Sequence, residues 1–120
     1  MRELKFRAWD EDEKKMHYSD DHEEEETAME TLGKFFIFYF GCEFTQYTGL
    51  KDKNGKEIYE GDIIRITFHE GDHEDGYMRW DDEHARWSWV EDTGETYGLT
   101  KFNNFEIIGN IYDNPELLKR

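Results

Sequence analysis

The chain has 120 residues, a formal net charge of −15 and an aromatic content of 17%. Its length suits one domain, and the aromatic side chains supply the large apolar area that a core needs. The acidic excess disfavours direct binding to DNA or RNA, because lysine and arginine attract phosphates and carboxylates repel them. The sequence also has no stretch of the ~20 apolar residues that a membrane-spanning helix needs.

The N-terminus and the cysteine content predict a cytoplasmic protein. Residues 1–7 lack the apolar segment of a signal peptide. Cys42 is the single cysteine, so no internal disulfide can form. A buried thiol in a reducing compartment is the simplest interpretation. We expect no cofactor and no contact with a membrane.

The first thirty residues predict a β hairpin followed by an acidic segment. Leu4, Phe6 and Ala8 alternate with polar or larger residues as in a strand, and residues 16–18 provide the return strand. Residues 20–30 are strongly acidic and have no apolar period. They predict a loop or a frayed helical turn, because like charges four residues apart destabilise a helix.

The segment Phe35–Phe40 contains five aromatic residues and one isoleucine. Its length and its β propensity predict a buried strand. Such a strand would promote aggregation if it stayed exposed, so we expect the fold or a partner subunit to cover it. Phe36, Phe38 and Phe40 are therefore candidate residues of a partner interface.

Asn54-Gly55 marks the clearest turn of the sequence. Asn-Gly is typical of a type I′ turn between two antiparallel strands, and this turn would place Leu50 opposite Tyr59. The following residues 63–68 alternate as a further strand. A Gly-Asp turn before such a strand is common in SH3-like barrels, although on its own it is weak evidence.

A second hairpin is predicted for residues 76–90, with its turn at residues 82–85. In this register Met78 faces Trp89 and Trp80 faces Trp87, so that four large side chains share one face. That face could stack nucleic-acid bases. A core or a subunit interface is the favoured interpretation, which makes three tryptophans further interface candidates: Trp80, Trp87 and Trp89.

The C-terminal residues predict a last strand and a helical turn. Residues 105–112 form the strand, with a possible bulge at Gly109. Asn114 and Pro115 then suit the start of a short helix. The predicted fold is mainly β, with small antiparallel sheets or an SH3-like barrel, an N-terminal β hairpin and a short C-terminal helical turn.

The acidic excess lies in two parts of this single domain of residues 1–120. Residues 1–30 hold 12 acids and 5 bases, and residues 67–100 hold 10 acids and 2 bases. The variable acidic segments are residues 19–34 and 69–100, approximately. The rest of the chain is balanced in charge.

The sequence contains no motif of an enzyme, such as a Gly-rich phosphate loop or a nucleophile elbow. His69 and His73 lie among carboxylates and are possible metal ligands, yet no cysteine pair supports them and a solvated loop is favoured. A cluster of lysines at the first turn leaves weak binding of a phosphate backbone as an alternative: Lys51, Lys53 and Lys56.

Three blocks from one end of the chain to the other follow a shared pattern. They are Phe6–Asp10, Gln46–Asp52 continuing through Ile58–Ile64, and Ile107–Tyr112 followed by Asn114–Leu118. In these blocks the chain resembles the YopX family. The resemblance implies a small β-rich, self-associating protein encoded by bacteriophages and prophages, mainly of Gram-positive bacteria. It implies no activity and no catalytic residues.

Three functional hypotheses follow. The first is a non-enzymatic phage accessory protein in the host cytoplasm that binds another copy of itself, with a host or phage protein as a further candidate partner. The second is an acidic DNA mimic that inhibits a host nucleic-acid-binding protein. The third is a weak nucleic-acid-binding module that uses the lysine cluster.

Overall fold

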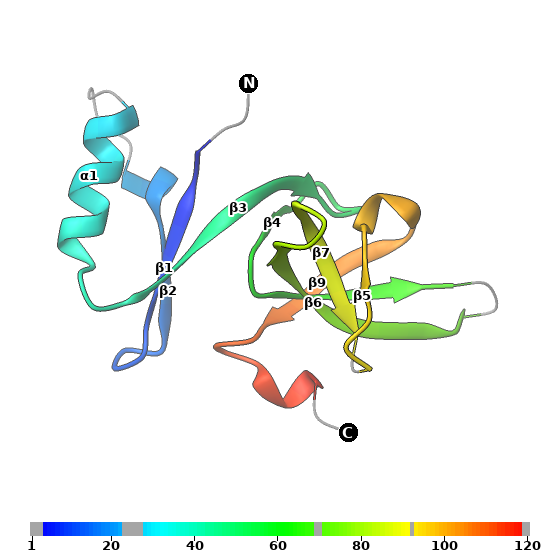
Figure 1. Ribbon diagram of the computed structural model, residues 1–120. Coiled ribbons are helices and arrows are strands. Elements are labelled where there is room, and N and C mark those ends of the chain that lie inside the picture. The colour runs from blue at the N-terminus through cyan, green and yellow to red at the C-terminus, as the bar shows by residue number, and fades with distance from the viewer. Residues whose placement is uncertain (1–3, 23–27, 69–70, 92, 119–120) are drawn as a thin grey trace. The chain divides into compact units, whose positions relative to one another are not determined.

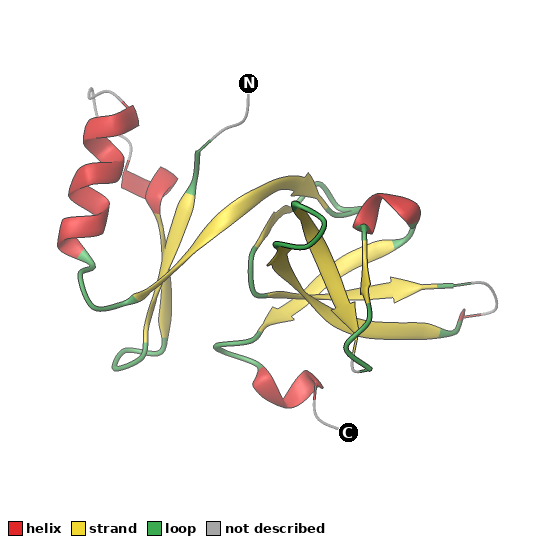
Figure 2. Cartoon of the chain, viewed as in Figure 1, coloured by secondary structure: helices red, strands yellow, loops and turns green. Residues whose placement is uncertain are grey.

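The computed structural model describes residues 4–22, 28–68, 71–91 and 93–118 (Figure 1). The chain divides into two compact units, an N-terminal unit Met1–Tyr47 and a C-terminal unit Thr48–Arg120. The domain expected from the sequence therefore contains two units, and each is described by itself. Strands dominate over helices in the described residues (Figure 2), as the sequence predicted.

The strands form two sheets. The four-stranded sheet has the order β2 (Lys15–Tyr18), β1 (Phe6–Asp10), β3 (Glu43–Lys51) and β4 (Glu57–Tyr59). The five-stranded sheet has the order β8 (Thr96–Tyr97), β7 (Arg86–Glu91), β6 (His73–Asp81), β5 (Asp62–Thr67) and β9 (Phe105–Asn110). The helical elements are η1 (Ser19–His22), α1 (Ala28–Phe38), η3 (Leu99–Lys101) and η4 (Pro115–Leu118).

The N-terminal unit places α1 against one face of its strands. In the antiparallel register, Ala8 of β1 lies opposite His17 of β2 and Phe44 of β3, so these three residues share a face. Rings of the helix cover that face. Phe36 packs against Phe44 with 4.9 Å between ring centroids, and Tyr39 stacks on His17 at 4.4 Å. The predicted N-terminal hairpin is confirmed.

The prediction of a strand at Phe35–Phe40 is wrong. Residues up to Phe38 belong to α1, and the chain then turns. The apolar residues follow the helical spacing i, i+3, i+4 and i+7, which puts one row of them on the buried face: Leu32, Phe35, Phe36 and Tyr39. Six apolar residues in succession hid this period, because a continuous run fits a buried strand as well as a helix.

The hairpin at Asn54-Gly55 exists, but its turn is not type I′. The backbone N–H of Asp52 donates to Lys56 O at 2.9 Å, and that of Gly55 donates to Asp52 O at 2.9 Å. Of the two turn residues only Gly55 has a positive φ, at 80°. The connection is a type I turn followed by a left-handed glycine, which shifts the predicted pairing by one residue.

The core of the C-terminal unit lies within a curled, half-barrel sheet. Its buried side chains come from β4, β5, β6, β7 and η3: Ile58, Ile64, Ile66, Met78, Trp89 and Leu99. Met78 pairs with Trp89 and Trp80 with Trp87, which confirms the predicted register of this hairpin. The indole N–H of Trp89 donates to Ile64 O at 3.0 Å and fixes the ring in the core.

The C-terminal segment follows its prediction closely. β9 pairs with β5, and the register shifts so that Ile63 faces Gly109 and Ile64 faces Ile107. This irregularity is the predicted bulge. η4 is the predicted helical turn, although the Asn114 side chain accepts its hydrogen bond from Asn110 N at 3.3 Å. In the described part of the chain, no helix has the length and apolar character needed to cross a membrane.

Candidate functional site

The aromatic interface candidates of α1 divide between the interior and the surface. Phe36 is half-buried, because its ring packs against Phe6 and Phe44. Phe38 and Phe40 are 78% and 91% exposed, although the Phe38 ring still meets the edge of Tyr39. Ile37, which the sequence did not single out, is also 78% exposed. We call Ile37, Phe38 and Phe40 the helix-end patch, because they lie at the C-terminal end of α1 and in the turn after it.

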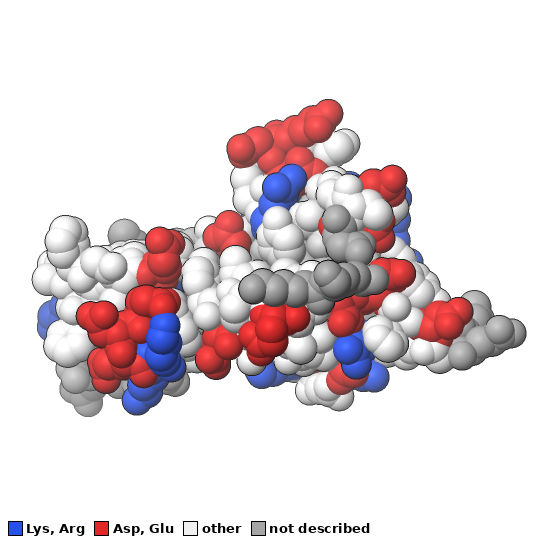
Figure 3. Space-filling view, turned by 90° about the horizontal axis from the view of Figure 1, so that it is seen from below, with Lys and Arg blue, Asp and Glu red and all other residues white. Residues whose placement is uncertain are grey.

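The helix-end patch lies in an uncharged stretch of an acidic protein. Residues 35–42 contain no Asp, Glu, Lys or Arg. Figure 3 shows the surface from one side, where acidic side chains form several separate groups with Lys or Arg among them.

The tryptophan candidates lie on one face of the β6–β7 hairpin and differ in how deeply they are buried. Trp89 is 1% exposed and belongs to the core, whereas Trp80 is 40% exposed. Trp87 lies between them in burial, and its ring meets Trp80 edge to face with 5.3 Å between centroids. A surface at this hairpin can therefore include Trp80 and the edge of Trp87.

The lysine cluster and the histidine loop remain at the surface. Lys51, Lys53 and Lys56 are exposed, and Lys53 Nζ lies 3.9 Å from Glu106 Oε1. His73 is exposed at the start of β6, and His69 lies outside the described residues. Within the described residues, His73 belongs to none of the groups of side chains placed closely enough to share a metal ion.

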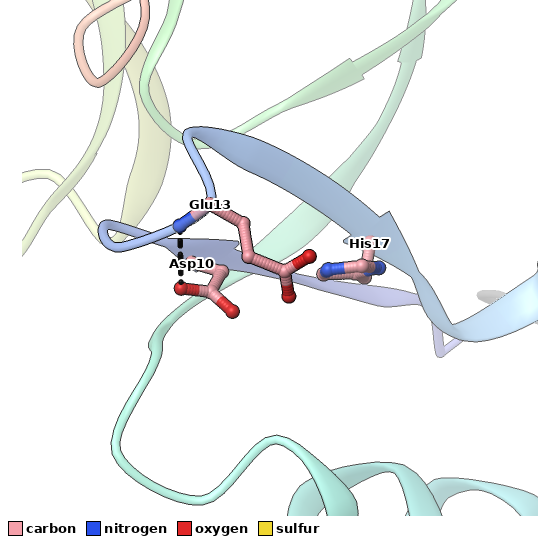
Figure 4. A group of neighbouring side chains, drawn as sticks. All are labelled: Asp10, Glu13 and His17. Carbon is pink, nitrogen blue, oxygen red and sulfur yellow. Dashed lines mark hydrogen bonds between the residues drawn. The ribbon is translucent and has the colours of Figure 1, made fainter.

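A different cluster gathers at the N-terminal hairpin. Asp10 ends β1, Glu13 lies in the turn, and His17 is in β2 (Figure 4). One ligand atom from each of these residues lies within 4.8 Å of the others. Asp10 and His17 meet because alternation along two paired strands puts both on the face that α1 covers. Figure 4 shows a ring nitrogen of His17 turned toward the Glu13 carboxylate.

Hydrogen bonds hold the Asp10 carboxylate in a fixed orientation. Its Oδ1 accepts from the backbone N–H of Asp12 at 3.0 Å and of Glu13 at 3.2 Å. The bond from Glu13 is the main reason that the pKa of Asp10 lies below its ordinary value, against the opposing effect of burial. Burial raises the pKa of the Cys42 thiol, and the nearby carboxylates of Asp10, Asp12 and Glu13 raise it further. The surroundings are thus strongly negative.

A second group of similar composition lies in the β6–β7 turn. It contains Asp81, Glu83 and His84. Here the imidazole is already paired, since His84 Nδ1 lies 2.8 Å from Asp81 Oδ2. Burial acts to raise the pKa of Asp81, but hydrogen bonds from the His84 side chain and backbone outweigh it and lower the pKa. Asp81 also accepts from Ser88 Oγ at 3.4 Å.

The group formed by Asp10, Glu13 and His17 was not predicted from the sequence. The chain has 30 acidic residues, so Asp10 and Glu13 could not be distinguished from the other carboxylates. The available signal was the hairpin itself, because strand alternation places Asp10 and His17 on one face. The position of Glu13 depends on the turn, in which Lys14 has a positive φ of 55°.

Comparisons with known proteins extend over nearly the whole chain. The family model described as YopX protein matches residues 5–119. Among solved structures, the crystal structure of protein EF1440 from Enterococcus faecalis is similar, with a TM-score of 0.64 and 27% sequence identity. This similarity covers 99% of the present chain and 100% of the other one. No curated protein matches the chain.

Proposed function

The chain belongs to the YopX family, and we propose that it is a protein-binding domain that pairs with a second copy of itself through the helix-end patch. The observation that carries this proposal is the 78–91% exposure of Ile37, Phe38 and Phe40. We further infer, from what the family resemblance implies, that it acts by binding, as a phage or prophage accessory protein in the bacterial cytoplasm.

The size of the helix-end patch suits the centre of an interface between two copies. An aromatic side chain can bury about 150–250 Å², so Phe38 and Phe40 together can bury about 300–500 Å², to which Ile37 adds. Apolar patches of this size on a monomer are often functional. A stable interface buries about 800 Å² on each partner. Polar groups around the patch would supply the remainder as a rim.

The charge of the protein favours this patch over other contacts between copies. Two molecules of net charge −15 repel each other. The repulsion is weakest where the touching surfaces carry no charged side chains, and residues 35–42 have none. A two-fold symmetric interface also brings the same patch of both copies together, so apolar side chains meet apolar side chains.

We expect the purified protein to dimerise as its concentration rises, and the double variant Phe38→Ser/Phe40→Ser to stay monomeric. Both side chains are largely exposed, so serine should leave the fold intact. Sedimentation velocity over a concentration series measures this equilibrium. Added salt should strengthen the dimer, because screening reduces the repulsion between the acidic copies while the apolar contact persists.

Trp80→Ser is the matched control, since it also removes an exposed aromatic side chain, from the other unit. It should dimerise like the unaltered protein. A protein that stays monomeric at every concentration contradicts the proposal. So does a dimer that survives Phe38→Ser/Phe40→Ser. A dimer lost only in Trp80→Ser would move the interface to the β6–β7 hairpin.

A further inference from the structure

In the group formed by Asp10, Glu13 and His17, an imidazole nitrogen lacks a hydrogen-bond partner and, among the described residues, the carboxylates lack a lysine or arginine to pair with. His17 Nε2 is buried and has no hydrogen-bond partner. Among the ion pairs of the described residues, none joins Asp10 or Glu13 to a lysine or arginine. One ligand atom of each of the three residues also lies within 4.8 Å of the others, so that two carboxylates and an imidazole come together. Each of these features costs free energy, because the carboxylates repel and a buried polar atom has lost its water.

We propose that Asp10, Glu13 and His17 bind one divalent transition-metal ion, of the class of Zn²⁺ or Mn²⁺. An imidazole nitrogen and two carboxylate oxygens are ligands that such ions accept. A single cation would offset the repulsion between the carboxylates and give the imidazole a partner. Three protein ligands also leave a coordination position open to water or to a partner's side chain.

The surrounding contacts hold two of the ligands in place. The Asp10 carboxylate accepts two backbone N–H bonds at Oδ1, which fix its orientation. The His17 ring stacks on Tyr39 with 4.4 Å between centroids. Supporting contacts of this kind orient metal ligands and strengthen binding. Glu13 is exposed in the turn and completes the set from the solvent side.

The β6–β7 turn provides an internal comparison. Asp81, Glu83 and His84 have the same ligand types, but His84 Nδ1 and Asp81 Oδ2 already form a 2.8 Å contact. A metal ion there would first have to break this pair. We therefore expect the ion at the N-terminal hairpin and not at this turn, although the two groups have the same composition.

Titration calorimetry of the metal-free protein with ZnCl₂, and separately with MnCl₂, tests the site. We expect one ion per chain, and a loss of affinity of about tenfold or more in Glu13→Gln. His17→Ala should lose binding as well, and His84→Ala should keep it. Bound Zn²⁺ should also raise the midpoint of thermal unfolding, since a ligand of the folded state stabilises it. Glu13→Gln should abolish that rise.

Glu13→Gln changes an exposed side chain without changing its size, so its folding is not in question, whereas His17→Ala removes a ring that packs on Tyr39. The absence of any binding of either ion overturns the proposal. Binding that survives Glu13→Gln, a loss confined to His84→Ala, and an equal loss in all three variants also overturn it. Because the readout is ion binding, the result does not depend on whether the protein dimerises.

Discussion

Replacing Asp52 by alanine is expected to lower the free energy of unfolding by about 3 kcal/mol. Asp52 is 7% exposed and follows β3. Its Oδ1 accepts from the backbone N–H of Asn54 and of Lys56, both at 2.9 Å. Its Oδ2 accepts from Ile107 N of β9 at 3.0 Å. Alanine would leave these three N–H groups without their charged partner and leave the β3–β4 turn tied to β9 mainly by the bond from Lys53 N to Phe105 O at 3.1 Å.

Chemical denaturation monitored by tryptophan fluorescence measures the loss. Asp82→Ala is the matched control, because it removes an exposed carboxylate from the other hairpin turn. It should change the free energy of unfolding by no more than about 0.5 kcal/mol. Equal effects of the two substitutions would show that Asp52 does not tie the turn to β9.

The contribution of Asp52 should also depend on pH. Burial acts to raise the pKa of this carboxyl group, but hydrogen bonds from the N–H groups of Ile107, Lys56 and Asn54 outweigh burial and lower the pKa. Because the folded pKa lies below the unfolded value of about 4, the stabilisation is complete above about pH 4. It is lost as the pH falls through the folded pKa.

The stability difference between the unaltered protein and Asp52→Ala should therefore be constant near neutral pH and shrink in acid. Comparing the two proteins at each pH removes the titration of the other carboxylates that they share. A difference that grows in acid would contradict the assigned sign of the pKa shift.

Gly76→Ala is expected to lower the free energy of unfolding by about 3 kcal/mol, the upper part of the range for overpacking. A Cβ at Gly76 of β6 would lie 2.4 Å from the Val90 carbonyl oxygen and 2.6 Å from Cε2 of Trp89. Neither atom can move cheaply. Val90 belongs to the β7 ladder, and the Trp89 ring is 1% exposed and hydrogen-bonded to Ile64 O at 3.0 Å.

Thermal unfolding, together with near-ultraviolet circular dichroism of the tryptophans, measures this effect. Gly98→Ala is the control in the same unit. Gly98 has a φ of −71°, and a Cβ there would meet the flexible end of Arg86 at 3.4 Å. The control should keep its stability within about 0.5 kcal/mol. An unchanged midpoint for Gly76→Ala would mean that the β6–β7 ladder yields more readily than its contacts indicate.

Local patterns were sufficient for the hairpins. Alternation predicted β1 and β2, and the polar turn at residues 82–85 set the pairing of Met78 with Trp89. The strand pairing around the Asn54-Gly55 turn was misassigned by one residue. The Asp52 carboxylate accepts hydrogen bonds from the N–H groups of Asn54 and Lys56. These bonds favour a type I turn that ends in a left-handed Gly55 over the type I′ turn typical of Asn-Gly.

The chain's own sequence determined that it is acidic and mainly β, and it carried the family pattern from Phe6 to Leu118, because these depend on composition and on short-range periods. Tertiary packing decided the state of residues 35–38, whose apolar run suits a strand or a helix equally well. The helix forms because it buries Leu32 and Phe35, the latter against Phe44 of β3, and leaves Phe38 exposed. The approach of Asp10, Glu13 and His17 was likewise set by strand pairing and turn geometry, which residue types alone do not encode.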